Sequence, residues 1–153
     1  MFHPREAEPL FIHGGRDFAL LRVADAPYEP DSRDPYAFVQ PLRLAREPVL
    51  RDDLVPIIQH PEGEPKKVAL KRFVVVEAND DEIQYYTSTS GGSSGAPVFN
   101  REFEVVGVHQ RYMGMSDGKH GRNVGTPIRA VLGELLKGDP EVYEQIAAVQ
   151  ESL

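Results

Sequence analysis

The order of the expected elements is the feature that most constrains the fold of this chain. Before residue 126 the sequence offers only short stretches with β-strand character, and no helix alternates with them. Apolar side chains at helical spacing begin at Ile128 and end at Gly138. We expect Thr126 to cap this helix and Asp139-Pro140 to begin a second one. The absence of strand–helix alternation disfavours a parallel α/β fold and favours an all-β domain followed by helices.

The candidate strands are short stretches rich in β-branched, aromatic or other apolar residues, separated by turn residues such as Asn79-Asp80-Asp81. They are Phe18–Val23, Leu54–His60, Val68–Glu77, Ile83–Thr89, Ala96–Phe99 and Phe103–His109. The last two are expected to form a hairpin around Asn100-Arg101, in which Phe103, Val105, Gly107 and His109 share one face.

Composition and charge exclude several classes of protein. Of 153 residues, 41% are hydrophobic and 27% charged, which is typical of a chain with a folded core. The net charge of -7 argues against nucleic acid and anionic membranes as partners, and no apolar run is long enough for a transmembrane helix. The first twenty residues do not resemble a signal peptide and the chain has no cysteine, so we expect a cytoplasmic location. The aspartate pairs have the spacing of turn residues, and we expect neither a metal nor an organic cofactor.

The segment Gly91–Pro97, with the sequence GGSSGAP, carries the clearest chemical signal. A serine nucleophile needs an exposed hydroxyl on a tight loop whose N–H groups point at the developing oxyanion, and flanking glycines permit that backbone path. A flexible surface loop is the plain alternative. Gly91-x-Ser93-x-Gly95, with Asp117 and His120 after it, also matches a nucleophile elbow, but an elbow requires a helix where Ala96–Phe99 is strand-like.

GSSGAPVF at 92–99, followed by EVVGVH at 104–109, resembles the serine segment of trypsin-like peptidases, in the form found in the bacterial glutamyl endopeptidase group. The resemblance implies that Ser94 is the nucleophile and that the N–H groups of Gly92 and Ser94 form the oxyanion hole. DFALLRV at 17–23 resembles the segment with the triad aspartate, which gives that role to Asp17. Residues 57–63 and 123–128 resemble the opening and the last strands of the second barrel.

The same resemblance implies a specificity subsite. Thr89, five residues before Ser94, and His109 stand where glutamyl endopeptidases bind the acidic P1 side chain of the substrate. A hydroxyl donor and a partly protonated imidazole can hold a carboxylate. Alternatively, His109 packs in the barrel and Thr89 lines the loop. No aspartate precedes the nucleophile loop in the way that a pocket for basic residues requires.

The histidine of the triad is missing from its expected place. In the chymotrypsin order it precedes the aspartate by roughly 45 residues, whereas only sixteen residues precede Asp17. His3 and His13 could substitute only along an unusual path. We therefore expect a weak or inactive peptidase as the chain stands. A truncated start, a complementing partner and a pseudoenzyme are the competing explanations.

Together these observations predict an all-β Greek-key barrel of the trypsin-like peptidase fold with C-terminal helices. We assign 1–46 to a remnant of the first barrel, 47–127 to a six-stranded second barrel and 128–153 to the helical tail. The expected function is that of a serine endopeptidase acting on peptide or protein substrates. A non-catalytic peptide-binding module is the alternative, and exposed barrel surface favours association with a partner.

Overall fold

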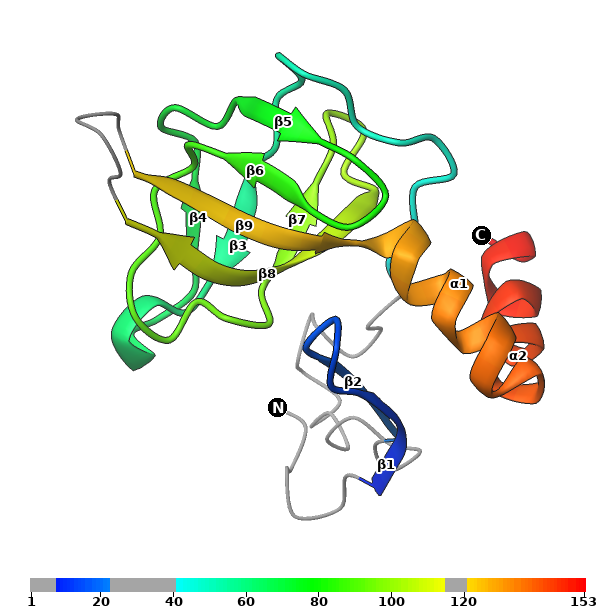
Figure 1. The fold of residues 1–153 in the computed structure, drawn as a ribbon. Helices are drawn as coiled ribbons and strands as arrows, with labels where there is room; N and C mark the ends of the chain where they lie inside the picture. The colour runs from blue at the N-terminus through cyan, green and yellow to red at the C-terminus, as the bar shows by residue number, and fades with distance from the viewer. Residues whose placement is uncertain (1–7, 23–40, 115–120) are drawn as a thin grey trace, which may run out of the picture.

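The computed structural model describes residues 8–22, 41–114 and 121–153. Seven of its strands form one antiparallel sheet (Figure 1). They are β3 (Ile57–Gln59), β4 (Lys67–Ala69), β5 (Val75–Ala78), β6 (Ile83–Tyr85), β7 (Pro97–Phe99), β8 (Val105–Met113) and β9 (Arg122–Pro127). Their order across the sheet is β4-β3-β7-β8-β9-β6-β5.

The sheet curls into a barrel because the segment before β3 also pairs with β5. The amide of Val55 donates to the carbonyl of Phe73 at 2.6 Å, and the amide of Val75 donates to the carbonyl of Asp53 at 2.8 Å. One continuous segment is therefore bonded to both edges of the sheet. The interior is filled by buried apolar side chains, among them Val55, Ile57, Val75, Ile83, Tyr85, Val98 and Val106. The predicted all-β fold with a helical tail is confirmed.

The barrel sheet has seven strands where the sequence predicts six, because the stretch Val68–Glu77 is two strands. Arg72 has a φ of 54°, in the left-handed region, and the chain turns there between β4 and β5. The β-branched residues on both sides of Lys71-Arg72 hide this turn in the sequence. Two further strand ends differ from the prediction. Strand β6 ends at Tyr85 and not at Thr89, and β8 continues past His109 to Met113.

The helical tail follows the barrel without a gap. Helix α1 (Ile128–Gly138) begins directly after β9, and α2 (Pro140–Glu151) follows with Asp139 accepting a hydrogen bond from the amide of Val142 at 3.2 Å. The prediction that Thr126 caps α1 is wrong. Thr126 still belongs to β9, and its hydroxyl donates to the carbonyl of Arg16 at 3.0 Å. Within the described ranges, neither α1 nor α2 combines the length and apolar character needed to span a bilayer.

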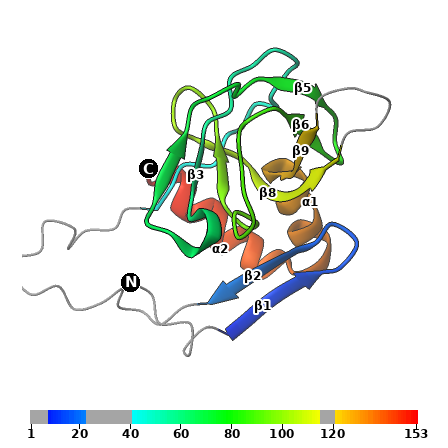
Figure 2. The same ribbon diagram turned by 90° about the vertical axis from the view of Figure 1, so that its left-hand side faces the viewer.

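A separate hairpin, β1 (Glu8–His13) and β2 (Phe18–Arg22), packs against the helices (Figure 2). The sequence predicts β2 but not β1, whose apolar stretch is short and bounded by Glu8-Pro9 and His13-Gly14. The rings of Phe11 and Phe18 stack at 5.9 Å. The cluster between hairpin and helices contains Leu10, Phe11, Phe18, Leu20, Phe99, Val105, Ile128, Val131, Leu135 and Val142.

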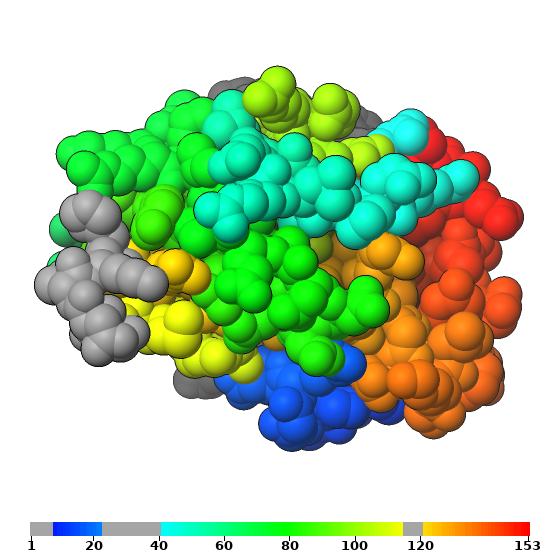
Figure 3. Space-filling model, turned by 45° about the horizontal axis from the view of Figure 1, so that its top comes forward, coloured from blue at the N-terminus to red at the C-terminus, as the bar shows by residue number. Residues whose placement is uncertain are grey.

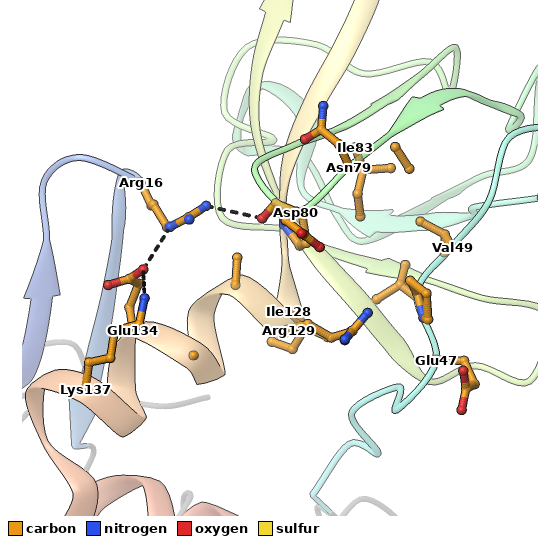
Figure 4. Close-up of a pocket in the computed structure, with 16 residues that line it drawn as sticks. Arg16, Glu47, Val49, Asn79, Asp80, Ile83, Ile128, Arg129, Glu134 and Lys137 are labelled. Carbon is orange, nitrogen blue, oxygen red and sulfur yellow. Dashed lines mark hydrogen bonds and ion pairs between the residues drawn. The ribbon is translucent and has the colours of Figure 1, made fainter.

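Arg16, in the turn of this hairpin, joins it to both the barrel and α1 (Figure 4). Its guanidinium donates to the carbonyl of Asp80 at 3.3 Å, and lies 3.1 Å from the carboxylate of Asp81 and 3.4 Å from that of Glu134. Figure 3 shows the hairpin (blue) in contact with the β5–β6 turn (green) and with α1 (orange). The hairpin turn therefore has a defined position relative to the barrel.

Two glycines of α1 provide a matched test of the hairpin's docking. A methyl group at Gly138 would lie 2.5 Å from the ring of Phe11, whereas one at Gly133 would meet nothing within 4 Å. We expect Gly133→Ala to stabilise the fold by about 0.5–1 kcal/mol, because alanine favours helix. Gly138→Ala should lose this gain and destabilise the fold by about 1–3 kcal/mol through displacement of Phe11. Chemical denaturation of both variants measures the difference, and equal effects would contradict the packing described.

Candidate active site

The loop that carries Ser94 is a tight turn that leads into a strand. The amide of Ser93 donates to the carbonyl of Ser90 at 3.2 Å, and that of Ala96 to the carbonyl of Ser93 at 3.0 Å. Strand β7 begins at Pro97, so no helix follows the serine pair. A nucleophile elbow is thereby excluded, since it requires a helix at this point. Asp117 and His120, which that alternative needs, lie outside the described residues.

Glycine is required at position 92 by backbone conformation and by space. Gly92 has a φ of 84°, and a Cβ there would lie 3.3 Å from the amide nitrogen of Glu62. The amide of Glu62 donates to the carbonyl of Gly91 at 2.7 Å, which ties the loop to the 3-10 turn Pro61–Gly63. Among the described residues, the N–H groups of Gly92 and Ser94 have no protein acceptor. Two neighbouring amides are thus free to bind an anionic oxygen.

Gln110 connects Ser94 to Asp17. The exposed Ser94 hydroxyl donates to the main-chain carbonyl of Gln110 at 2.9 Å, and the side-chain amide of Gln110 donates to the carboxylate of Asp17 at 3.3 Å. The proposed nucleophile and the proposed triad aspartate therefore lie on the same side of the molecule, although they are 77 positions apart in the sequence. The sequence analysis missed Gln110. The register of β8 against β9 shifts between His109 and Arg111, so Gln110 lies at a strand irregularity that no period in the sequence marks.

None of the three described histidines contacts Ser94 or Asp17. His13 accepts a hydrogen bond from the amide of Arg16 at 3.1 Å through Nδ1, and its Nε2 lies 3.4 Å from a carboxylate oxygen of Glu134. His60 Nδ1 lies 3.0 Å from the carbonyl of Glu64, and the ring of His109 is hydrogen-bonded to the Tyr85 hydroxyl. His3 and His120 lie outside the described residues. His13, the candidate substitute base, is thus paired with Glu134 of helix α1.

The carboxylate of Glu134 contacts both His13 and Arg16 of the hairpin. Its hydrogen bond from Lys137 is the main reason why the pKa of Glu134 lies below its ordinary value, although partial desolvation opposes the shift. The positive charge of Lys137 and a hydrogen bond from Arg16 act in the same direction. Glu134 therefore remains ionised and attracts the hairpin turn that contains Asp17.

His109 lies in the barrel wall and is hydrogen-bonded to a buried tyrosine. Only 4% of His109 is exposed and Tyr85 is fully buried, and the Tyr85 hydroxyl lies 2.8 Å from Nδ1 of His109. Burial lowers the pKa of His109 and raises that of Tyr85. Both side chains are therefore neutral at neutral pH.

Thr89 is held by the last strand of the barrel. Its hydroxyl donates to the side-chain oxygen of Asn123 at 2.7 Å, and the side-chain nitrogen of Asn123 donates to the carbonyl of Thr87. Thr89 is half-buried. Neither Asn123 nor Tyr85 was singled out as a site residue from the sequence, because only the strand register brings them next to Thr89 and His109. Among the described residues, no three His, Cys, Asp or Glu side chains could hold a metal ion.

The family model described as trypsin-like peptidase domain matches residues 3–108, a range that contains both Asp17 and Ser94. The chain belongs to the trypsin-like peptidase family. A glutamyl endopeptidase of Staphylococcus epidermidis is 30% identical over 115 residues, which cover 72% of this chain and 38% of that protein. A glutamyl endopeptidase of Staphylococcus aureus strain MW2 is 59% identical over 27 residues, which cover 18% of this chain and 8% of that protein. The trypsin-like chain thus spans little more than a third of the first relative's length.

Solved structures support the fold assignment of this trypsin-like chain. The active form of the Rv3671c protease from M. tuberculosis superposes with a TM-score of 0.65 at 20% identity, covering 86% of this chain and 57% of that one. A serine endoprotease from Yersinia pestis gives a TM-score of 0.60 at 20% identity, covering 88% and 45%. At this level of identity the likeness concerns the fold alone.

The buried state of His109 predicts how the stability of this trypsin-like fold depends on pH. Because the pKa of His109 is lowered on folding, the unfolded chain takes up a proton at this side chain more readily than the folded one. Its contribution to stability is therefore complete above about pH 6.5 and declines as the pH falls towards the folded-state pKa. We expect His109→Gln to remove this component. Denaturation midpoints from pH 8 to pH 5 should fall less steeply in the variant than in the wild type. Identical slopes would contradict the burial of a neutral imidazole.

Proposed function

We propose that the chain carries the nucleophile half of a serine endopeptidase that cleaves peptide bonds through an acyl-enzyme. The observation that supports this most directly is that the Ser94 hydroxyl and the Asp17 carboxylate both contact Gln110, while two amides of the Ser94 loop have no protein acceptor among the described residues. Membership of the trypsin-like peptidase family supports the same reaction class. The activity of the whole relatives is part of the proposal, because this chain spans only part of their length.

In the proposed reaction, Ser94 Oγ attacks the carbonyl carbon of the scissile bond. The N–H groups of Gly92 and Ser94 stabilise the oxyanion that forms. A histidine takes the hydroxyl proton and passes it to the leaving amine, after which water releases the acyl group. Asp17 orients that histidine and stabilises its charged form. As described, the Ser94 hydrogen is directed at a main-chain carbonyl, which is not a base, so the chain by itself is expected to react slowly.

The proposed substrate is an extended peptide bound beside β8. Pairing of β7 with β8 ends at Val108, whereas β9 pairs with β8 as far as Met113. The other edge of β8 beyond Gln110 has no strand partner among the described residues, and strand addition is a common mode of peptide binding there. Thr89 and His109 are proposed to line the P1 subsite. The glutamyl endopeptidase relatives make an acidic P1 side chain one candidate, and its neutral amide counterpart is the other.

A non-catalytic peptide-binding module is the second candidate. It is favoured by one observation: Gln110 contacts both Ser94 and Asp17, and no described histidine lies between them. Such a module would hold an extended peptide along β8 without cleaving it. The two functions differ in one measurable property, which is covalent reactivity of Ser94.

A fluorescent peptidyl phosphonate measures that reactivity. We expect slow labelling that Ser94→Ala abolishes and Ser93→Ala retains, because Ser93 is buried and its hydroxyl faces the amide of Ser90. Added imidazole should increase the rate by supplying the missing base. An oxyanion hole without a complete triad retains catalysis of about 10³- to 10⁴-fold over water, and this is the scale of the residual reactivity expected at Ser94. Peptide binding without labelling at Ser94 would favour the module and reject the endopeptidase.

A further inference from the structure

Strand register places Tyr85, His109 and Asn123 on one face of the sheet. Tyr85 pairs with Asn123, and His109 pairs with Gly125 two positions further along β9. Directly paired residues and residues two apart in a strand project to the same side. A Cβ at Gly125 would lie 3.2 Å from the Tyr85 hydroxyl, so glycine leaves the room in which this hydroxyl reaches His109. Thr89 joins the same face through its bond to Asn123.

The tyrosine determines the tautomer of His109. The Tyr85 hydroxyl is fully buried, and Nδ1 of His109 is its only hydrogen-bond partner among the described residues. A buried hydroxyl whose hydrogen has no acceptor is costly, so Tyr85 donates and Nδ1 accepts. The neutral imidazole then carries its hydrogen on Nε2, which has no acceptor among the described residues. His109 therefore offers one N–H donor.

Asn123 determines whether the Thr89 hydroxyl can donate or accept a hydrogen bond from a ligand. The bond from the side-chain nitrogen of Asn123 to the carbonyl of Thr87 fixes the orientation of its amide, so its oxygen must face Thr89. The hydroxyl hydrogen of Thr89 is directed at that oxygen. Thr89 Oγ1 is left with lone pairs only, and it can accept but not donate.

We propose that this P1 subsite selects a neutral carboxamide side chain, that of glutamine, over a carboxylate. The inference rests on the proposed function, since it takes Thr89 and His109 as the lining of the P1 subsite. A carboxamide accepts a hydrogen bond from His109 Nε2 and donates one to Thr89 Oγ1. Thr89 is bonded to Asn123 and His109 pairs with Gly125, and such same-face positions of a strand lie about 7 Å apart, a gap that one amide with two hydrogen bonds can bridge.

A carboxylate matches this pattern less well. It has only acceptors, so one of its oxygens would face the lone pairs of Thr89. Reversing the Thr89 hydroxyl would leave its oxygen against that of Asn123 at 2.7 Å, without a hydrogen between them. The neutral imidazole adds no positive charge that would compensate. An acidic preference would require rearrangement of both Tyr85 and Asn123.

Binding of matched peptides to the full chain with Ser94→Ala tests the proposal without the complication of cleavage. The peptides are fluorescein-Ala-Ala-Val-Xaa-Ala-Ala-amide with glutamine, glutamate or leucine at Xaa, and fluorescence anisotropy gives their Kd. We expect the glutamine peptide to bind about tenfold or more tightly than the glutamate peptide, the scale of one mismatched buried hydrogen bond. Glutamate binding as tightly as glutamine or more tightly would overturn the inference and leave the peptidase proposal intact.

Three variants separate the hydrogen-bond pattern from simple packing. Thr89→Val keeps the shape but removes the acceptor, and should abolish the preference for glutamine over glutamate, whereas Thr89→Ser should retain it. Tyr85→Phe releases Nδ1 of His109 and should shift the ratio towards glutamate. A preference that survives both Thr89→Val and Tyr85→Phe in folded protein would overturn the inference. If no peptide binds and the phosphonate does not label the wild type, the proposed function fails, and the inference fails with it.

Discussion

The docking of the β1–β2 hairpin on α1 decides whether Asp17, in the hairpin, and Ser94, in the barrel, come together in one candidate site. Apolar contacts between Phe11, Phe18 and the helix supply most of the binding energy, since exposed ion pairs contribute only about 0–1 kcal/mol each. Arg16 instead fixes the orientation of the hairpin. Its contacts with the β5–β6 turn and with Glu134 fix the hairpin turn, and Asp17, the next residue, then meets Gln110.

Gln110 and His109 show how one strand serves two parts of the site. The register of β8 against β9 shifts between His109 and Arg111, and at this irregularity Gln110 contacts the catalytic candidates while His109 is hydrogen-bonded to Tyr85 in the proposed specificity subsite. The pairing of β8 with β7 and β9 therefore positions both groups of residues.

The proposed specificity subsite illustrates why identical residue types can suit different ligands. Thr89 and His109 alone are compatible with an acidic side chain. Their neighbours Asn123 and Tyr85 fix which atoms carry hydrogens. Because a hydrogen bond needs one donor and one acceptor, these neighbours convert two polar groups into a pattern that suits an amide.

The sequence by itself determined the fold class, the glycine-rich loop with Ser94 and the helical tail, because these follow from local patterns: β-rich stretches with turn residues, glycines around Ser94, and apolar residues at helical spacing. It failed at Arg72, where β-branched neighbours conceal a turn, and at Thr126, whose strand continues directly into α1. The long-range contacts of Arg16, Gln110, Tyr85 and Asn123 join residues from 16 to 118 positions apart, and only the tertiary structure decided them. Such contacts depend on strand register and on hairpin docking, neither of which leaves a periodic signal in the sequence.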